Sequence, residues 1–454
     1  MVVTGKIKKN SAGAGEGWST DIFLVFFPQE NEQQLTSSSS SPFKFPTINS
    51  NHILTRTQST ISICALLIFL TFLLFTLSTF EPNNNFTNSH NTPTSNTPAL
   101  QGLGTLYTRG TTAMDNLLLC HVTESVTTKQ LQLFLRAFYR SGLPSNSDLL
   151  FIFNSVSTPE SFDNVILEEN EFFLKIVGRY RTELCNGGEG LDFPASFNPI
   201  RFVKSGDKVV GKGEPIWGWK IKSNNSSLVR CGGEAESTRT SYGSVVGFGV
   251  GELNPENSLS GFMDHVPMSL RRWASYPMIL GRVRRNFKHV MLVDVKKVLL
   301  LGDPLGRVKN KSPESVFLSS SPPLATKHGH KSSENTRQRT INPAVIMGGV
   351  RGIRRLSAAM LTEIVRATTN QQHNKWKNLV TESGLLSRLV TNEFTLKSVR
   401  LSMSAESIPS SVSESTIANQ TMVWIEQSDY KDIESVIMKH ICSFSIDSAL
   451  YRDC

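Results

Sequence analysis

Residues 276–304 read YPMILGRVRRNFKHVMLVDVKKVLLLGDP, and this stretch carries the clearest fold signal in the chain. The basic pattern over 268–288 predicts a helix interrupted at Pro277, and the apolar run 289–294 follows it. Apolar runs without alternation are typical of strands that helices cover on both faces of a parallel sheet. Asp294 therefore stands at the carboxyl end of a predicted buried strand, which is where open α/β sheets bind ligands.

The same alternation of strand and helix extends in both directions from this stretch. Residues 116–120 and 148–153 are short apolar runs that predict buried strands, and a helical spacing of apolar residues lies between them. Thr127 or Thr128 is suited to cap that helix, and Gly142 to end it. Residues 342–349 predict a further strand, and 352–368 a helix. The pattern predicts an α/β fold with a mostly parallel central sheet flanked by helices.

Residues 61–80, ISICALLIFLTFLLFTLSTF, contain no charge, proline or glycine. Since about 20 apolar residues span a bilayer core of about 30 Å, we expect a single transmembrane signal-anchor helix over 59–80. Lys44 and Arg56 precede it, so the positive-inside rule predicts a cytosolic N-terminus and type II topology. A buried core helix and a cleaved signal peptide are the alternatives, which the absent polar face and the long preceding tail disfavour.

The remaining sequence divides by composition. Residues 1–58 are Ser-rich and predict a disordered cytosolic tail, although such an N-terminus also admits a plastid transit peptide. Residues 81–110 are rich in Asn, Thr, Ser and Pro and predict a flexible lumenal stem. The folded domain is expected over 111–454, with a disordered polar insert at about 306–340.

Charge, sequons and cysteines bear on partners and compartment. Lys and Arg number 47 and Asp and Glu 38, a net charge of +9, which favours anionic partners over a dedicated nucleic-acid binder. The cysteines beyond the apolar segment either form two disulfides and leave one thiol, or all stay reduced. Five glycosylation sequons lie on the same side of that segment, as expected for a lumenal domain, and begin at Asn85, Asn224, Asn225, Asn310 and Asn419.

Asp294-Val295-Lys296, after its apolar strand, resembles the metal-binding Asp-x-Asp segment of nucleotide-sugar glycosyltransferases with the A-type fold. Residues 342–349 are similar to an acceptor-side strand of those enzymes, and 116–153 to their nucleotide-binding half. The region 111–454 also resembles a plant family of single-pass membrane proteins. The resemblance implies a membrane-anchored Golgi protein that transfers a sugar from a nucleotide-sugar donor to a glycan or glycoprotein acceptor, with Mn²⁺ or Mg²⁺ as cofactor.

One departure from that motif matters for the chemistry. Lys296 stands where the family has its second Asp, and an ammonium repels a divalent cation but pairs with phosphate. Asp294 is the metal ligand if a metal binds. Either a transferase acts without metal, or the fold serves as a non-catalytic, membrane-anchored binding or scaffold module. Asp303 and Glu363 are hypotheses for a general base. The predicted nucleotide-sugar-binding residues are Thr123, Glu124, Asp294, Lys296, Arg284, Arg285, Asn342, Gly348 and Gly349.

Overall fold

The computed structural model describes 66–69, 97–100, 103–154, 160–185, 202–205, 213–218, 229–230, 237–253, 266–283, 286–320, 341–373, 381–392, 396–404, 408–426 and 428–454. The chain divides into two units, Met1–Asn91 and Thr92–Cys454. In the first unit, residues 66–69 are helical with exposed apolar side chains, and the rest of the predicted span lies outside the described residues. Within the described part of the chain, no helix has the length and apolar character needed to cross a bilayer.

The second unit is built on a nine-stranded sheet with the order β1-β2-β8-β4-β3-β9-β12-β11-β13. The central strands β8, β4, β3 and β9 are parallel, and β12 continues the sheet antiparallel to β9. The predicted α/β class with parallel central strands is therefore confirmed. The strands are β1 (Thr97–Leu100), β2 (Leu103–Thr108), β3 (Asn116–Val122), β4 (Ser147–Phe153), β8 (Val245–Gly249), β9 (His289–Asp294), β11 (Ser315–Ser320), β12 (Ile341–Gly349) and β13 (Arg400–Ser404).

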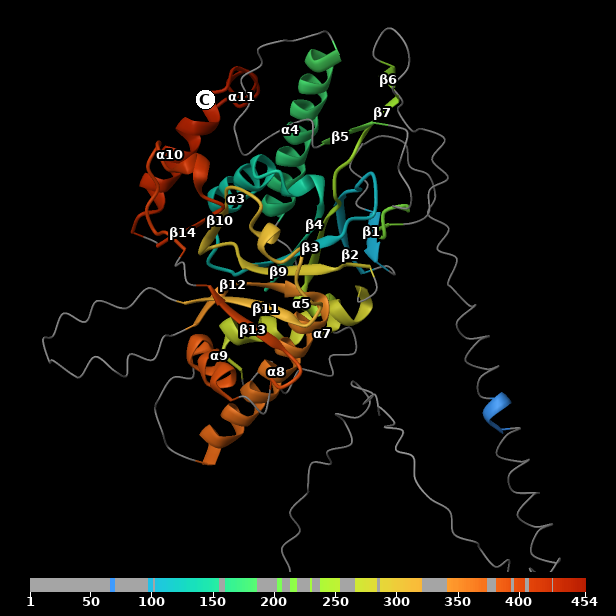
Figure 1. Ribbon diagram of the computed structural model, residues 1–454, viewed down its shortest axis with the longest axis vertical. Coiled ribbons are helices and arrows are strands. Elements are labelled where there is room, and N and C mark those ends of the chain that lie inside the picture. The colour runs from blue at the N-terminus through green and yellow to red at the C-terminus, as the bar shows by residue number, and fades with distance from the viewer. Residues whose placement is uncertain are drawn as a thin grey trace, which may run out of the picture. The chain divides into compact units, whose positions relative to one another are not determined.

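Helices cover both faces of this sheet (Figure 1). One face packs against α3 (Thr128–Arg140) and α4 (Glu160–Cys185), with α10 (Tyr430–Cys442) and α11 (Ser445–Leu450) beside them. The other face packs against α7 (Met268–Val283), α8 (Val350–His373) and α9 (Glu382–Thr391). Successive strand residues supply the two cores in turn, because neighbouring side chains on a strand point to opposite faces.

Shorter elements complete the unit. The pair β10 (Val298–Leu300) and β14 (Met422–Trp424) lies beside the α3 face, and β5 (Val203–Ser205), β6 (Val229–Arg230) and β7 (Ser237–Thr240) form a small sheet of their own. The other short elements are η1 (Leu143–Ser145), α5 (Val250–Leu253), η4 (Pro304–Arg307) and η5 (Ile417–Asn419). The predicted cap of α3 is confirmed, since Thr127 and Gln130 form a reciprocal capping box.

The predicted stem is wrong for its last part, because residues 97–110 belong to the folded unit. Strands β1 and β2 pair with each other, and β2 pairs antiparallel with β8 in the central sheet. Leu106 and Tyr107 are buried against that sheet. Gly104 has φ +75° and lies under the ring of Phe248, where a larger residue would not fit. The polar, Gly-containing composition of this segment is typical of a linker, although the segment is packed.

The predicted insert is also wrong for the described residues 306–320. They contain the end of η4 and all of β11, which lies between β12 and β13 in the central sheet. Val316 and Leu318 are buried, and Ser315 and Ser319 are buried with them, so the strand is packed inside the sheet despite its serines. Residues 321–340 lie outside the described residues.

A buried carboxyl group fastens the start of β4 to its neighbours. Asp148 is 1% exposed; its Oδ2 accepts a hydrogen bond from Trp217 Nε1 at 2.9 Å, and its Oδ1 accepts one from Ser244 N at 2.8 Å. Burial raises the pKa of Asp148 to about 7, although both hydrogen bonds act to lower it. The Asp148 side chain thus joins β4 to the residues before β8 and to the indole of Trp217. Trp217 is fully buried and is therefore a packing residue.

The raised pKa of Asp148 predicts a pH-dependent stability. Between about pH 4 and pH 7 the folded state holds a proton that the unfolded chain releases, so the free energy of unfolding falls as pH rises. An Asp148→Asn variant cannot titrate there, and the wild type should lose about 1.4 kcal/mol relative to it for each pH unit in that interval. Urea unfolding of both proteins at pH 4.5 and pH 6.5 measures this difference, and an unchanged gap would contradict it.

Candidate functional site

A cavity of about 460 Å³ opens where the strand order of the sheet reverses. From β3 the chain proceeds outward through β4 to β8, and then returns to place β9 on the other side of β3. The carboxyl ends of β3 and β9 thus form a topological switch point, the usual ligand crevice of open α/β sheets. His121 and Asp294 are paired in register there. The cavity is lined by His121, Thr123, Ser125, Gln130, Ser269, Arg272, Asp294, Lys296, Lys297, Glu382, Trp424, Ile425 and Glu426.

Asp294 ends β9 and faces this cavity, as the sequence predicted. Its carboxylate is buried, and Oδ1 accepts a hydrogen bond from the Lys296 backbone N–H at 3.1 Å. Its Oδ2 lies 3.8 Å from both Arg272 Nη1 and Lys297 Nζ. Lys296 turns its ammonium the other way and donates to Ser125 Oγ at 3.0 Å. Asp294 thus lies between Arg272 of α7 and Lys297 of the turn after β9, and Lys296 of the same turn reaches across to the loop after β3.

Arg272 of α7 forms a shorter ion pair with Glu382 than either cation forms with Asp294. Its Nη2 lies 2.6 Å and its Nε 2.8 Å from Glu382 Oε1, and Nη2 also donates to the Pro343 carbonyl at 3.1 Å. Trp273 Nε1 donates to the same Glu382 oxygen at 2.5 Å. Burial acts to lower the pKa of Arg272, but the negative charge of Glu382 and Asp294 outweighs it, so the pKa is raised. The guanidinium stays charged and links α7, α9 and β12.

His121 is a cavity residue that sequence reasoning missed. It is 1% exposed, and neither ring nitrogen has a hydrogen-bond partner within the described part of the chain. Burial first, and then the charges of Arg272 and Lys297, hold its pKa well below the usual range, so the imidazole is neutral. In the sequence it lies inside the apolar run of β3, where a histidine is indistinguishable from a core residue.

The remaining predicted residues divide between the cavity and other places. Thr123 lines the cavity, with its Oγ1 3.1 Å from Ser125 Oγ, whereas Glu124 beside it is exposed and does not. Asn342 is buried at the start of β12, and its Oδ1 accepts a hydrogen bond from Ala344 N at 3.0 Å. It adjoins Pro343, which Arg272 contacts, without lining the cavity itself.

Gly348 and Gly349 lie at the opposite end of β12, where Gly349 pairs with His289 at the start of β9. A Cβ there would lie 2.3 Å from Ser315 O or 2.2 Å from Pro313 O, so these glycines permit close packing of β11 and its preceding turn. These two glycines therefore lie away from the switch-point cavity and from Asp294. Arg284 and Arg285 lie outside the described residues, as do Asn85, Asn224 and Asn225, while Asn310 and Asn419 are exposed.

Neither hypothesis for a general base holds for this cavity. Asp303 caps η4 by accepting a hydrogen bond from Leu305 N at 3.0 Å, and it pairs with Lys309 Nζ at 2.8 Å. Glu363 of α8 pairs with Arg366 and with Arg388 beside a separate cavity of about 250 Å³. Both carboxylates have structural partners, and neither lines the switch-point cavity.

The donor set at the switch point does not fit the divalent cation that the resemblance implies. Asp294 Oδ2 is shared by two cationic side chains, and Glu382 Oε1 is taken by Arg272 and Trp273. Over the described residues, no group of three or more His, Cys, Asp or Glu side chains is arranged to hold a metal ion. Ammonium and guanidinium groups beside hydroxyls suit an anion instead.

Comparisons with known proteins give a family and similar solved structures. Residues 97–407 match the family model described as "Domain of unknown function (DUF7780)". The galactosyltransferase LgtC, solved in complex with donor and acceptor sugar analogs, aligns with a TM-score of 0.33 and 9% identity, covering 72% of this chain and 96% of that one. A TM-score this low establishes nothing about function. No curated protein matches the sequence.

Glu382 should be required for stability because it is the main partner of a buried guanidinium. Glu382→Ala leaves the charge of Arg272 without its closest carboxylate, and we expect a loss of about 3–5 kcal/mol in the free energy of unfolding. Glu426→Ala, at an exposed carboxylate of the same cavity, should cost less than about 0.5 kcal/mol. Chemical denaturation of both variants makes the comparison, and similar costs would contradict the role given to Glu382.

Proposed function

We propose that this chain, which belongs to the family of the domain of unknown function DUF7780, binds the diphosphate of a nucleotide sugar in the switch-point cavity and transfers the sugar to an acceptor. The supporting observation is the gathering of Arg272, Lys296 and Lys297 at the carboxyl ends of β3 and β9. Cationic side chains at a switch point are the arrangement expected for a phosphate-bearing ligand.

The cations differ in how free they are to meet a ligand. Arg272 is committed to Glu382, whereas Lys297 is 44% exposed and lies 3.8 Å from Asp294 Oδ2. Among the residues that the structure describes, the Lys296 ammonium contacts only a hydroxyl, Ser125 Oγ. A ligand phosphate is a stronger partner for an ammonium than a hydroxyl or a single carboxylate oxygen 3.8 Å away, so both lysines gain by turning to it. Thr123, Ser125 and Ser269 add hydroxyl donors, and the first turn of α3 begins at the cavity with its positive dipole end.

Sugar transfer would use the same charges. As an acceptor hydroxyl oxygen forms its bond to the anomeric carbon, the bond between that carbon and the phosphate oxygen breaks. The electron pair of the broken bond moves to the diphosphate, where negative charge accumulates, and the hydroxyl proton passes to the leaving diphosphate or to water. Lys296 and Lys297 would stabilise that charge electrostatically. A resident metal ion has no part in this scheme, in keeping with the donor set described above.

Removal of either lysine should weaken the binding of a nucleoside diphosphate. Lys296→Ala and Lys297→Ala each delete one ammonium from the cavity, and we expect about a tenfold rise in Kd per variant, since tenfold corresponds to about 1.4 kcal/mol. Calorimetry with UDP and GDP, with and without manganese, measures the effect. Lys311→Ala, at an exposed lysine outside the cavity, is the matched control. Equal affinities in all three variants would overturn the proposed diphosphate site.

A non-catalytic binding module is the second candidate, and the ionic contacts of the cavity favour it. Three cationic and three anionic side chains line the cavity, so their charges balance before any ligand enters. Two of the anionic side chains, Asp294 and Glu382, already form ion pairs with Arg272. Hydrolysis of a bound nucleotide sugar separates the two readings, because only an enzyme would release the free sugar. Binding without sugar release would favour the module.

We also propose that the second unit is lumenal, anchored by the predicted span over 59–80 in a type II orientation, as in a Golgi protein. A disulfide joins Cys442 to Cys454, and disulfides persist in oxidising compartments. Asn310 and Asn419 are exposed, as a glycosylated sequon must be. These observations support the proposal from two independent sides.

Expression of the full chain in a secretory cell tests the topology. Glycosidase should lower the apparent mass, and Asn310→Gln and Asn419→Gln should each remove part of that shift, because both side chains are accessible. Protease added to intact microsomes should digest only the residues before the span. Protection of the N-terminus, or an unchanged mass after glycosidase, would contradict lumenal placement.

A further inference from the structure

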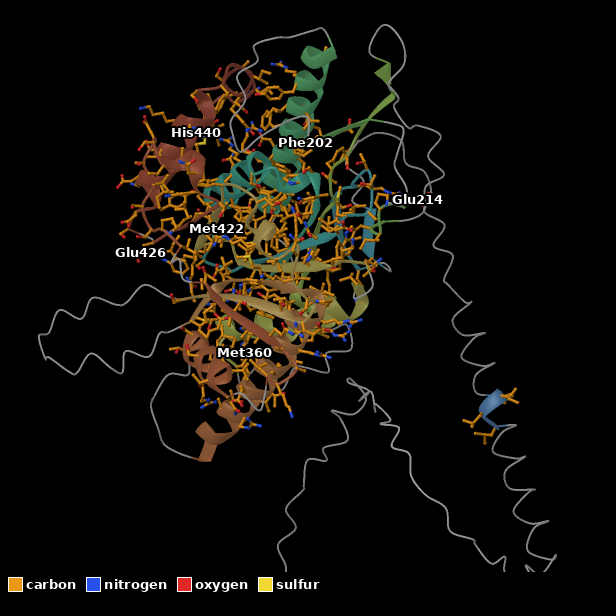
Figure 2. All side chains as sticks on the ribbon, viewed as in Figure 1. Phe202, Glu214, Met360, Met422, Glu426 and His440 are labelled. Carbon is orange, nitrogen blue, oxygen red and sulfur yellow. A yellow bond between two sulfur atoms is a disulfide. The ribbon has the colours of Figure 1, made fainter. Side chains whose placement is uncertain are left out.

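The C-terminal segment, residues 408–454, supplies one wall of the switch-point cavity although the family match ends at residue 407. Trp424, Ile425 and Glu426 line the cavity beside the cationic turn. Figure 2 labels Met422, Glu426 and His440 of this segment, which runs along the side of the second unit. The site is thus incomplete without residues outside the matched region.

Backbone hydrogen bonds fix this wall against the cationic turn. Strand β14 pairs antiparallel with β10, placing Trp424 opposite Val298, the residue that follows Lys297. Ile425 N donates to the Lys297 carbonyl at 2.8 Å. Trp424 N donates to the Pro409 carbonyl at 2.8 Å, within the same segment. Backbone hydrogen bonds therefore join the wall directly to the turn that carries the cavity lysines.

The far end of the segment is anchored to α3. Arg140 forms a buried ion pair with Asp447, and Arg136 Nη1 lies 2.6 Å from Asp453 Oδ2. The Arg136 guanidinium also lies 4.4 Å from the centre of the Tyr451 ring. The disulfide between Cys442, at the end of α10, and Cys454 links the two ends of this anchor. Anchoring at both ends makes the wall a preformed surface, which lowers the entropic cost of binding a ligand.

The chemistry of the wall differs from that of the cationic turn. Trp424 is half-buried and Glu426 is exposed, and the Glu426 carboxylate forms no ion pair among the described residues. A carboxylate repels phosphate but accepts hydrogen bonds from hydroxyl groups, and an indole face packs against an apolar ring face. At about 460 Å³ the cavity is also in the usual range for small ligands, about 300–1,000 Å³, and has room beyond a diphosphate.

We infer that Trp424 and Glu426 form a subsite for the neutral, polyhydroxylated sugar ring of the ligand, next to the lysines that take its diphosphate. This inference rests on the proposed diphosphate site and adds the part of the ligand that the C-terminal segment recognises. The ring would stack on the indole of Trp424 while its hydroxyls donate to the carboxylate of Glu426.

The test is a comparison of two ligands that differ only by the sugar. Calorimetry of the full chain with UDP and GDP, and with a panel of UDP-sugars and GDP-sugars, gives the ratio of the two Kd values. Trp424→Ala and Glu426→Gln should each raise the Kd of the sugar conjugate about tenfold and leave that of the free nucleotide unchanged. Trp424→Phe, which keeps an aromatic face, should restore most of the affinity.

Matched controls come from the same segment. Phe444→Ala removes another half-buried aromatic ring and Asp432→Asn another exposed carboxylate, both outside the cavity, and neither should change the ratio. Equal losses for conjugate and free nucleotide in Trp424→Ala, or no loss in either cavity variant, would overturn the sugar subsite alone. Failure of the wild type to bind any nucleoside diphosphate would overturn the proposed function, and the subsite with it.

Discussion

The buried charge of Arg272 is the constraint on which the organisation of the site depends. A guanidinium with 2% exposure is tolerated only when carboxylates and carbonyls replace its water. Glu382 supplies two of these contacts, Pro343 a third and Asp294 a longer one. Those partners come from α9, β12 and β9, so satisfying one charge fixes the relative positions of three elements. The cavity is the solvent-facing side of that arrangement.

The strand order then decides what the cavity can meet. Because β3 and β9 continue into connections that leave in opposite directions, their carboxyl ends leave a crevice that neither connection fills. Asp294 and His121 lie side by side at its floor, one anionic and contacted by cations, the other neutral and without a hydrogen-bond partner in the described part of the chain. Strand geometry alone places chemically different groups at adjacent positions.

The sequence predicted the parts of this structure whose signals are local. The apolar runs of β3, β4 and β9, the cap of α3 and the position of Asp294 follow from patterns within a few residues. Strands β1, β2 and β11 were missed because polar, Gly-containing or Ser-rich composition masks a short buried strand. Gly348 and Gly349 lie away from Asp294 because β12 runs antiparallel to β9, a direction that the local sequence does not indicate.

The site residues that were missed are those that only the fold brings together. Glu382 comes from α9 and contacts Arg272 of α7. Trp424 and Glu426 come from the segment after the family match, where Ile425 between them bonds to the Lys297 carbonyl.

No sequence periodicity links Arg272 to Glu382, which lies 110 positions later in the chain. What joins them is charge and backbone pairing: Arg272 needs Glu382, and β10 needs an edge partner, which β14 provides. A cavity assembled in this way has its cations on α7 and on the turn after β9, and has the Trp424 indole and the Glu426 carboxylate on the C-terminal wall. In the proposed scheme the cationic side determines which charged group enters, and the wall determines which neutral group accompanies it.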